Sequence, residues 1–67
     1  MSKIATGDLI RAARKKRDLS VAELADKVGV TRQAAALWEA GAEPTVKNLQ
    51  AIAEALDVPL ISLLVKP

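Results

Sequence analysis

The chain has 67 residues, of which 51% are hydrophobic and 27% charged, with a formal net charge of +2 and neither cysteine nor histidine. This length allows one small domain, and the high hydrophobic fraction argues against intrinsic disorder. Without cysteine there are no disulfides and no thiolate zinc sites, and without histidine the commonest general base and metal ligand is missing. The composition therefore disfavours an enzyme, and we expect neither a metal nor a cofactor.

The charge is distributed unevenly along the chain. Residues 1–36 hold eight Lys/Arg against four Asp/Glu, whereas residues 37–67 hold two against four. The positive potential therefore lies in the first half, where a polyanion would bind. No apolar stretch approaches the roughly 20 residues that span a bilayer, and residues 1–20 contain no secretory signal. We expect a cytoplasmic protein without a membrane partner.

Short segments with helical periodicity, and no strand-like alternation, predict an all-α fold. The predicted helices cover residues 7–17, 21–28, 32–40, 46–56 and 59–64. An apolar stripe on the fourth helix consists of Val46, Leu49, Ile52, Ala53 and Leu56. Pro59 suits the first position of the last helix, because that position needs no backbone N–H.

The middle of the chain has the pattern of a helix-turn-helix. Ser20 and Glu23 have the spacing of a capping box at the start of a helix, and Gly29 suits the left-handed residue that ends it. Thr31 caps the next helix after one intervening residue. Two short helices thus join through a tight turn.

The third predicted helix carries a candidate DNA-reading face. Helical spacing places Arg32, Gln33, Ala36 and Leu37 opposite the core-facing Trp38. In the major groove, arginine can bond guanine and glutamine can bond adenine through two hydrogen bonds each, and alanine or leucine suits thymine methyl groups. The expected partner is double-stranded DNA.

Several strings also carry a resemblance to a known family: Ile10–Arg14, Leu19–Ser20, Glu23–Val30, Leu37–Gly41, and Asn48–Leu49 through Ala55–Leu56. On these strings, residues 7–64 resemble the Cro/repressor-type, lambda-repressor-like helix-turn-helix domain of phage and bacterial regulators. The resemblance implies that residues 1–67 form a single domain, a compact five-helix bundle. It also implies that the third helix enters the major groove, usually in a dimer on a two-fold operator.

The resemblance assigns roles to individual residues. The positions of the base readers correspond to Arg32, Gln33, Ala36 and Leu37. The positions that hold DNA phosphates correspond to Ser20, Val21, Thr31, Thr45, Lys47 and Asn48. Arg14 and Glu39 match an ion pair that joins the first helix to the third, which we assign to structure. No small-molecule effector is expected.

The chain departs from the family pattern in two places. Ala34, Ala35 and Ala36 replace polar side chains that are usual on the reading helix, which predicts a narrow sequence preference and leaves open a natural repressor or an engineered DNA-binding protein. Ile61 is apolar where relatives are mostly charged, so Ile61 and Val65 are candidate contacts of a homodimer. A different class of function is a protein-interaction module, antitoxin-like or an assembly domain, that uses the apolar residues 60–65.

Overall fold

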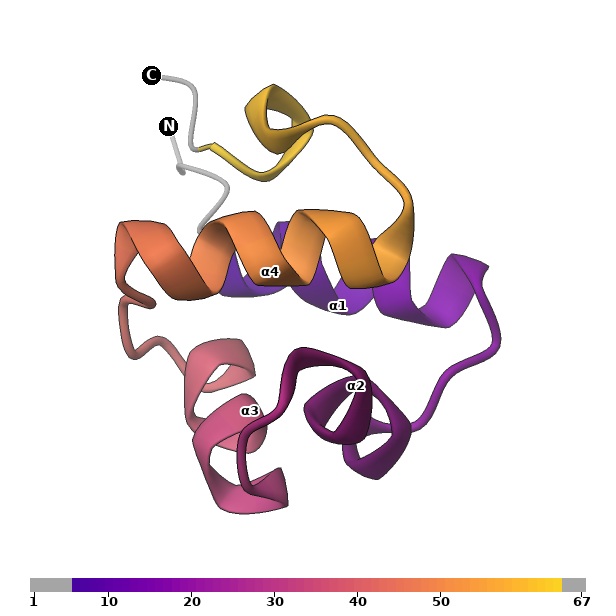
Figure 1. Cartoon of the computed structure of the whole chain (residues 1–67), viewed down its shortest axis with the longest axis vertical. Coiled ribbons are helices and arrows are strands. Elements are labelled where there is room, and N and C mark those ends of the chain that lie inside the picture. The colour runs from indigo at the N-terminus through magenta and orange to yellow at the C-terminus, as the bar shows by residue number, and fades with distance from the viewer. Residues whose placement is uncertain (1–5, 65–67) are drawn as a thin grey trace.

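The computed structural model of the chain describes residues 6–64, and this part consists of helices joined by turns and loops, without strands. Its elements are α1 Thr6–Lys16, α2 Val21–Val28, α3 Arg32–Glu39, α4 Val46–Leu56 and the 3₁₀ helix η1 Leu60–Leu63. Helices α2 and α3 lie together at one end of the long axis and η1 lies at the other, with α1 and α4 between them (Figure 1). The all-α fold class is as predicted from the sequence.

All five elements contribute to one hydrophobic core. Its largest fully buried side chains are Ile10, Leu24, Ile52, Leu56 and Leu63. Trp38 of α3 packs into the same cluster with 5% of its surface exposed. Burying a large aliphatic side chain stabilises a fold by about 1.5–3 kcal/mol relative to leaving it exposed. The core therefore anchors the inner side of every helix, including α3.

Hydroxyl side chains begin three of the helices. The side-chain oxygens of Ser20, Thr31 and Thr45 accept hydrogen bonds from the backbone N–H three residues later, at 3.0, 3.1 and 3.1 Å. Such caps contribute typically about 1 kcal/mol each, because they satisfy amides that have no partner inside the helix. They fix the starts of α2, α3 and α4 at the residues predicted from the sequence.

The predicted fifth α-helix over residues 59–64 is wrong: the structure has a four-residue 3₁₀ helix there. The amides of Ser62 and Leu64 donate to carbonyls three residues back, on Pro59 and Ile61, at 3.0 and 3.2 Å. The Ser62 hydroxyl also donates to the Pro59 carbonyl, at 2.7 Å. A segment this short forms too few four-residue-spaced bonds to make an α-helix, so the tighter turn prevails. The described fold thus has four α-helices rather than five.

Val46 is a second difference from the sequence analysis. It was expected on the buried stripe of α4, but 70% of its surface is exposed. Val46 is the first residue of α4, and a helical side chain tilts toward the N-terminus of its helix. Its side chain therefore projects beyond the core, whereas Ile52 and Leu56 on the same stripe are buried.

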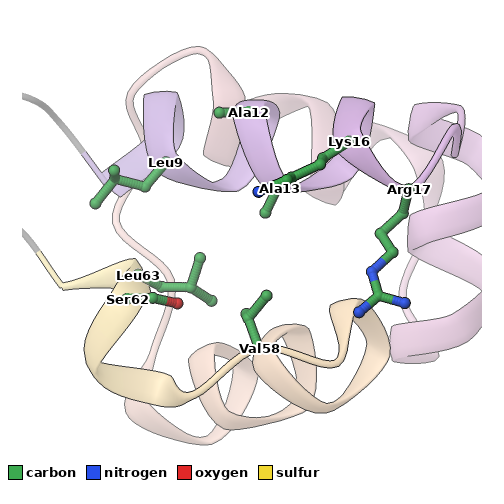
Figure 2. Close-up of a pocket in the computed structure, with 8 residues that line it drawn as sticks. All are labelled: Leu9, Ala12, Ala13, Lys16, Arg17, Val58, Ser62 and Leu63. Atoms are coloured by element: carbon green, nitrogen blue, oxygen red, sulfur yellow. The ribbon is translucent and has the colours of Figure 1, made fainter.

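A cavity of about 630 Å³ lies between α1 and η1 (Figure 2). Its lining residues are Leu9, Ala12, Ala13, Lys16, Arg17, Val58, Ser62 and Leu63. Most of the surface that lines it is apolar. The cavity is at the end of the molecule away from α3. Among the described helices, none has the length and apolar character that a membrane span requires.

Candidate nucleic-acid interface

Helix α3 has one buried and one exposed face. Ala35 and Trp38 point into the core, with 0% and 5% of their surfaces exposed. The four predicted base readers are all exposed: Arg32, Gln33, Ala36 and Leu37. The structure thus brings the predicted base readers together on one outward surface of α3, at the end of the molecule that α2 and α3 form (Figure 1).

The turn between α2 and α3 sets how α3 leaves α2. The amides of Gly29 and Val30 both donate to the carbonyl of Ala25, at 2.8 and 3.0 Å. Gly29 has φ +88°, a left-handed conformation that side chains resist, and a Cβ there would meet no atom within 4 Å. Backbone conformation rather than space therefore favours glycine at this position. Ala25 is 2% exposed and belongs to the same core cluster as Ala35 and Trp38 of α3.

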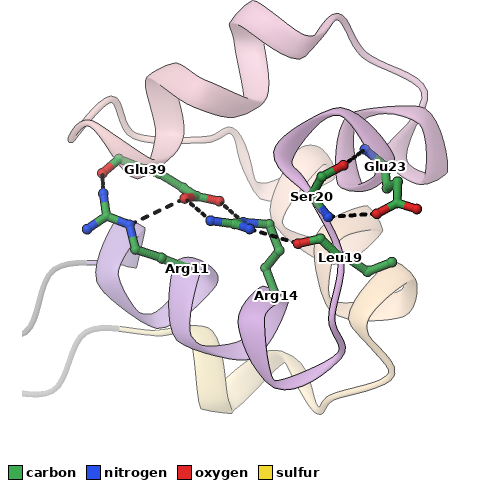
Figure 3. Close-up of polar contacts among 6 residues, drawn as sticks. All are labelled: Arg11, Arg14, Leu19, Ser20, Glu23 and Glu39. Carbon is green, nitrogen blue, oxygen red and sulfur yellow. Dashed lines mark hydrogen bonds and ion pairs between the residues drawn. The ribbon is translucent and has the colours of Figure 1, made fainter.

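Glu39, the last residue of α3, is bound to two arginines of α1 (Figure 3). Arg14 donates from Nε to Oε2 at 2.7 Å and from Nη2 to Oε1 at 3.0 Å. Its Nη1 also donates to the carbonyl of Leu19 at 2.7 Å. Arg11, which the sequence analysis missed, donates from Nη2 to the Glu39 carbonyl at 3.0 Å and from Nε to Oε1 at 3.4 Å.

The ionisation of this cluster is set by its own members. Burial by itself would raise the pKa of Glu39, whose side chain is only 6% exposed. The hydrogen bonds and positive charges of Arg14 and Arg11 outweigh burial and hold that pKa below its usual value. The hydrogen bond to Glu39 in turn raises the pKa of Arg14, against the opposing effect of burial. The charges therefore satisfy one another within the protein, as a structural role requires.

A close backbone approach joins the start of α1 to the end of α3. Gly7 is buried in α1, and a Cβ added to it would collide with the carbonyl oxygen of Trp38. Only glycine lets the two helices come this near without a shift of the backbone. Together with the Glu39 cluster, this contact fixes the C-terminal half of α3 against α1.

The start of α4 is an open, positively charged position. Thr45 and Lys47 are exposed and Asn48 is half-buried, with the Asn48 amide bonded to the Thr45 hydroxyl. The first amides of a helix have no acceptor inside it, so those of Val46 and Lys47 are available to an anion. The exposed Val46 side chain also lies at the start of α4. Its position as the first helical residue is the sequence signal that could have predicted this exposure.

The start of α2 has a different electrostatic character. The Ser20 amide donates to Oε1 of Glu23 at 2.8 Å, completing the capping box seen in Figure 3. Hydrogen bonds from the backbone and side chain of Ser20 hold the pKa of Glu23 below its usual value. Val21 is half-buried against the core. The Glu23 carboxylate thus places a negative charge beside the N-cap of α2, although it bonds the amide of Ser20 and not the first amides of the helix itself.

The remaining predicted site residues are placed as follows. Thr31 is exposed, and its hydroxyl oxygen caps α3 by accepting from the Ala34 amide. Ile61 on η1 is 55% exposed. Val65 lies outside the described residues. Within residues 6–64, no group of three or more acidic side chains is placed to hold a metal ion.

Comparison with known proteins points to one family. A family model described as helix-turn-helix matches residues 10–63. The DNA-binding domain of the P22 c2 repressor in solution is 38% identical, with a TM-score of 0.88 over 94% of this chain and 84% of that one. The crystal structure of the P22 c2 repressor with synthetic operator 9T is 39% identical, with a TM-score of 0.84 over 91% and 94% of the two chains.

Two other solved structures show how widely this fold is used. SinR, the master regulator for biofilm formation, in complex with DNA is 30% identical, with a TM-score of 0.80 over 87% of this chain and 95% of that one. HEPD of Streptomyces albus, with substrate and Fe(II) bound, is 32% identical, with a TM-score of 0.88 over 97% of this chain. That match covers only 15% of HEPD, so it concerns a small part of the enzyme. No curated protein sequence matches the chain.

Proposed function

Because the chain belongs to the helix-turn-helix family, we propose that it is a repressor-like regulator that binds double-stranded DNA sequence-specifically, with α3 in the major groove. The observation that carries this proposal is the division of α3 into two faces: Trp38 anchors it in the core, while Arg32 and Gln33 are exposed at its N-terminus. The P22 c2 repressor and SinR, both solved with DNA, support the same function.

The proposed base contacts follow from the chemistry of the exposed face. Arg32 would donate two hydrogen bonds to guanine, and Gln33 would bond adenine through its amide. Ala36 would allow the helix backbone to approach the groove floor. With only two polar readers on this face, the preferred sequence is expected to be short.

Phosphate contacts would fix the register of α3 on the duplex. The start of α4 is the best-placed anchor, because Lys47 adds a charged side chain to the amides at the helix N-terminus. Thr45 and Asn48 would contribute from the same turn. Thr31 would contribute from the start of α3, and Ser20 and Val21 from the start of α2, where Glu23 places a negative charge beside them.

The proposed regulatory mechanism is occupancy: a domain bound over a promoter blocks polymerase without catalysing a reaction. It would act in the cytoplasm, on the DNA of its cell. Neither a cofactor nor an effector is part of this mechanism.

Salt-dependent titration tests DNA binding directly. Fluorescence anisotropy with a labelled random duplex, at about 50 and about 200 mM salt, should show affinity that falls steeply with salt, by about 0.9 in log K per phosphate contact for each decade. Weak association that does not respond to salt would rule out the proposed function.

A second candidate function has its own observation. Ile61 of η1 and its C-cap Leu64 are 55% and 37% exposed. They flank Ser62 and Leu63 in the sequence, two residues that line the apolar cavity between α1 and η1 (Figure 2). We propose that this surface binds a second copy of the chain, so that two α3 helices address a two-fold operator. Sedimentation equilibrium should detect a dimer that Ile61→Asp weakens. A wild-type protein that stays monomeric at all concentrations would contradict this, and binding of an unrelated protein at η1 would instead favour an interaction module.

A further inference from the structure

The exposed face of α3 becomes apolar after its first two residues. Beyond Gln33, its exposed residues up to the helix end are Ala36 and Leu37, and the C-cap Ala40 is exposed as well. Leu37 is 59% exposed, and it is the one large hydrophobic side chain of α3 among the four that are exposed in the described residues. The second half of the proposed reading surface thus has no side chain that can donate or accept a hydrogen bond.

A leucine in the major groove can favour only certain base edges. The edges of guanine, adenine and cytosine present hydrogen-bond donors and acceptors, and covering them with an apolar side chain removes their water without replacing its bonds. Thymine differs because it carries a methyl group at C5 that projects into the groove. A cytosine that is methylated at C5 presents the same apolar group at the same ring position.

We propose that Leu37 makes DNA binding depend on a C5-methyl group, so that the protein distinguishes 5-methylcytosine from cytosine as well as thymine from uracil. This inference rests on the proposed function, because it requires α3 in the major groove. The ligand it names is a methylated pyrimidine at one position of the site. Cytosine methylation at that position would therefore regulate binding.

The size of the effect follows from the area that one methyl group removes from water. Burial of one CH₂-sized group contributes free energy that corresponds to roughly a fourfold change in affinity. A dimer that reads two half-sites would show about the square of that factor. Both values lie well within the range of a titration measurement.

The test uses the duplex recovered by selection from a random library with the wild-type protein. Each thymine of the selected site is replaced in turn by uracil, which keeps the base pairing and removes only the methyl group. At the position that responds, duplexes with cytosine and with 5-methylcytosine are then compared. We expect roughly fourfold weaker binding to uracil than to thymine, and roughly fourfold tighter binding to 5-methylcytosine than to cytosine.

Variants assign the effect to the side chain. Leu37→Ala and Leu37→Gln should each bring the thymine-to-uracil ratio close to one, and circular dichroism should show that both fold, since Leu37 is exposed. Glu54→Ala, which shortens an exposed side chain on α4 outside the proposed DNA-binding and dimer surfaces, is the control and should keep the wild-type ratio.

The outcomes separate this inference from the proposed function. If the wild-type protein selects a consensus but binds every uracil duplex as tightly as its thymine counterpart, the inference is wrong and DNA reading by α3 stands. A methyl response that persists in Leu37→Ala would also overturn it. Failure to select any consensus would refute sequence-specific binding itself, and the inference with it.

Discussion

Arg14 and Glu39 meet in a two-point contact between α1 and α3, with Nε to Oε2 at 2.7 Å and Nη2 to Oε1 at 3.0 Å. Arg14 is 12% exposed and Glu39 6% exposed at the side chain, so little water screens the pair. The same guanidinium also donates to the carbonyl of Leu19, which precedes α2. One residue of α1 therefore joins the end of α3 to the segment that leads into α2.

We expect Glu39→Ala to destabilise the fold by about 2–3 kcal/mol, because it leaves a buried guanidinium without its carboxylate. Urea unfolding followed by circular dichroism measures this change. Asp57→Asn is the matched control: it removes the charge from the Arg17–Asp57 pair, which is 86% exposed on the aspartate side, and asparagine tolerates the left-handed conformation at this residue. Asp57→Asn should lower the free energy of unfolding by less than about 1 kcal/mol. If the two variants lose the same free energy of unfolding, Glu39 does not have the stabilising role assigned to it.

The lowered pKa of Glu39 predicts the direction of the acid response. A carboxyl group with a lower pKa in the folded state adds stability that is complete above its unfolded pKa of about 4.3. That contribution should disappear as the pH falls through the folded-state pKa. Denaturant titrations between pH 7 and pH 2 should show a smaller loss for Glu39→Gln than for the wild-type protein. If stability falls equally with pH in the two proteins, Glu39 does not contribute to the acid response.

Gly7→Ala should destabilise the protein even though alanine favours helices. Helix propensity alone predicts a gain of about 1 kcal/mol. The added Cβ would collide with the Trp38 carbonyl, however, and the repacking that relieves such contacts typically costs about 1–3 kcal/mol. Thermal unfolding of the variant should give a lower Tm than the wild type. A higher Tm would show that α1 and α3 do not approach as closely as the structure has them.

Lys47→Ala should weaken binding to all DNA sequences by a similar factor. A phosphate contact carries no sequence information, so its loss should also reduce the salt dependence by about 0.9 in the slope of log K. Anisotropy titrations of a selected and a random duplex at several salt concentrations measure both effects. Lys27→Ala, on α2, offers a comparison with another exposed lysine. A change in the preferred sequence of Lys47→Ala would contradict its assignment to the backbone.

Much of the fold was predictable because its signals are local. Ser20 with Glu23, Gly29, Thr31 and Thr45 are caps and stops whose geometry depends on a few neighbouring residues, and each is found where the sequence predicted it. The type of the C-terminal helix was not predictable, because a proline followed by four residues is compatible with a short α-helix or a short 3₁₀ helix. There the Ser62 hydroxyl bonds the same Pro59 carbonyl as the Ser62 amide, a contact that periodicity does not capture.

The site was predictable to a different degree. The exposed face of α3 follows from helical spacing and from the inward Trp38. The link from Arg11 to Glu39 spans 28 residues, so no local pattern indicates it. The exposure of Val46 also depends on where the core ends rather than on the apolar stripe of α4. Long-range contacts and the edges of the core are therefore what the sequence left undetermined.

The most direct measurement is to select binding sites from a random duplex library with the wild-type protein and with Arg32→Ala in parallel. Loss of one bidentate guanine contact should cost roughly 1–3 kcal/mol and relax the preference at a single base pair, with the remaining positions unchanged. An identical consensus from both proteins, or none from the wild type, would contradict base reading by α3.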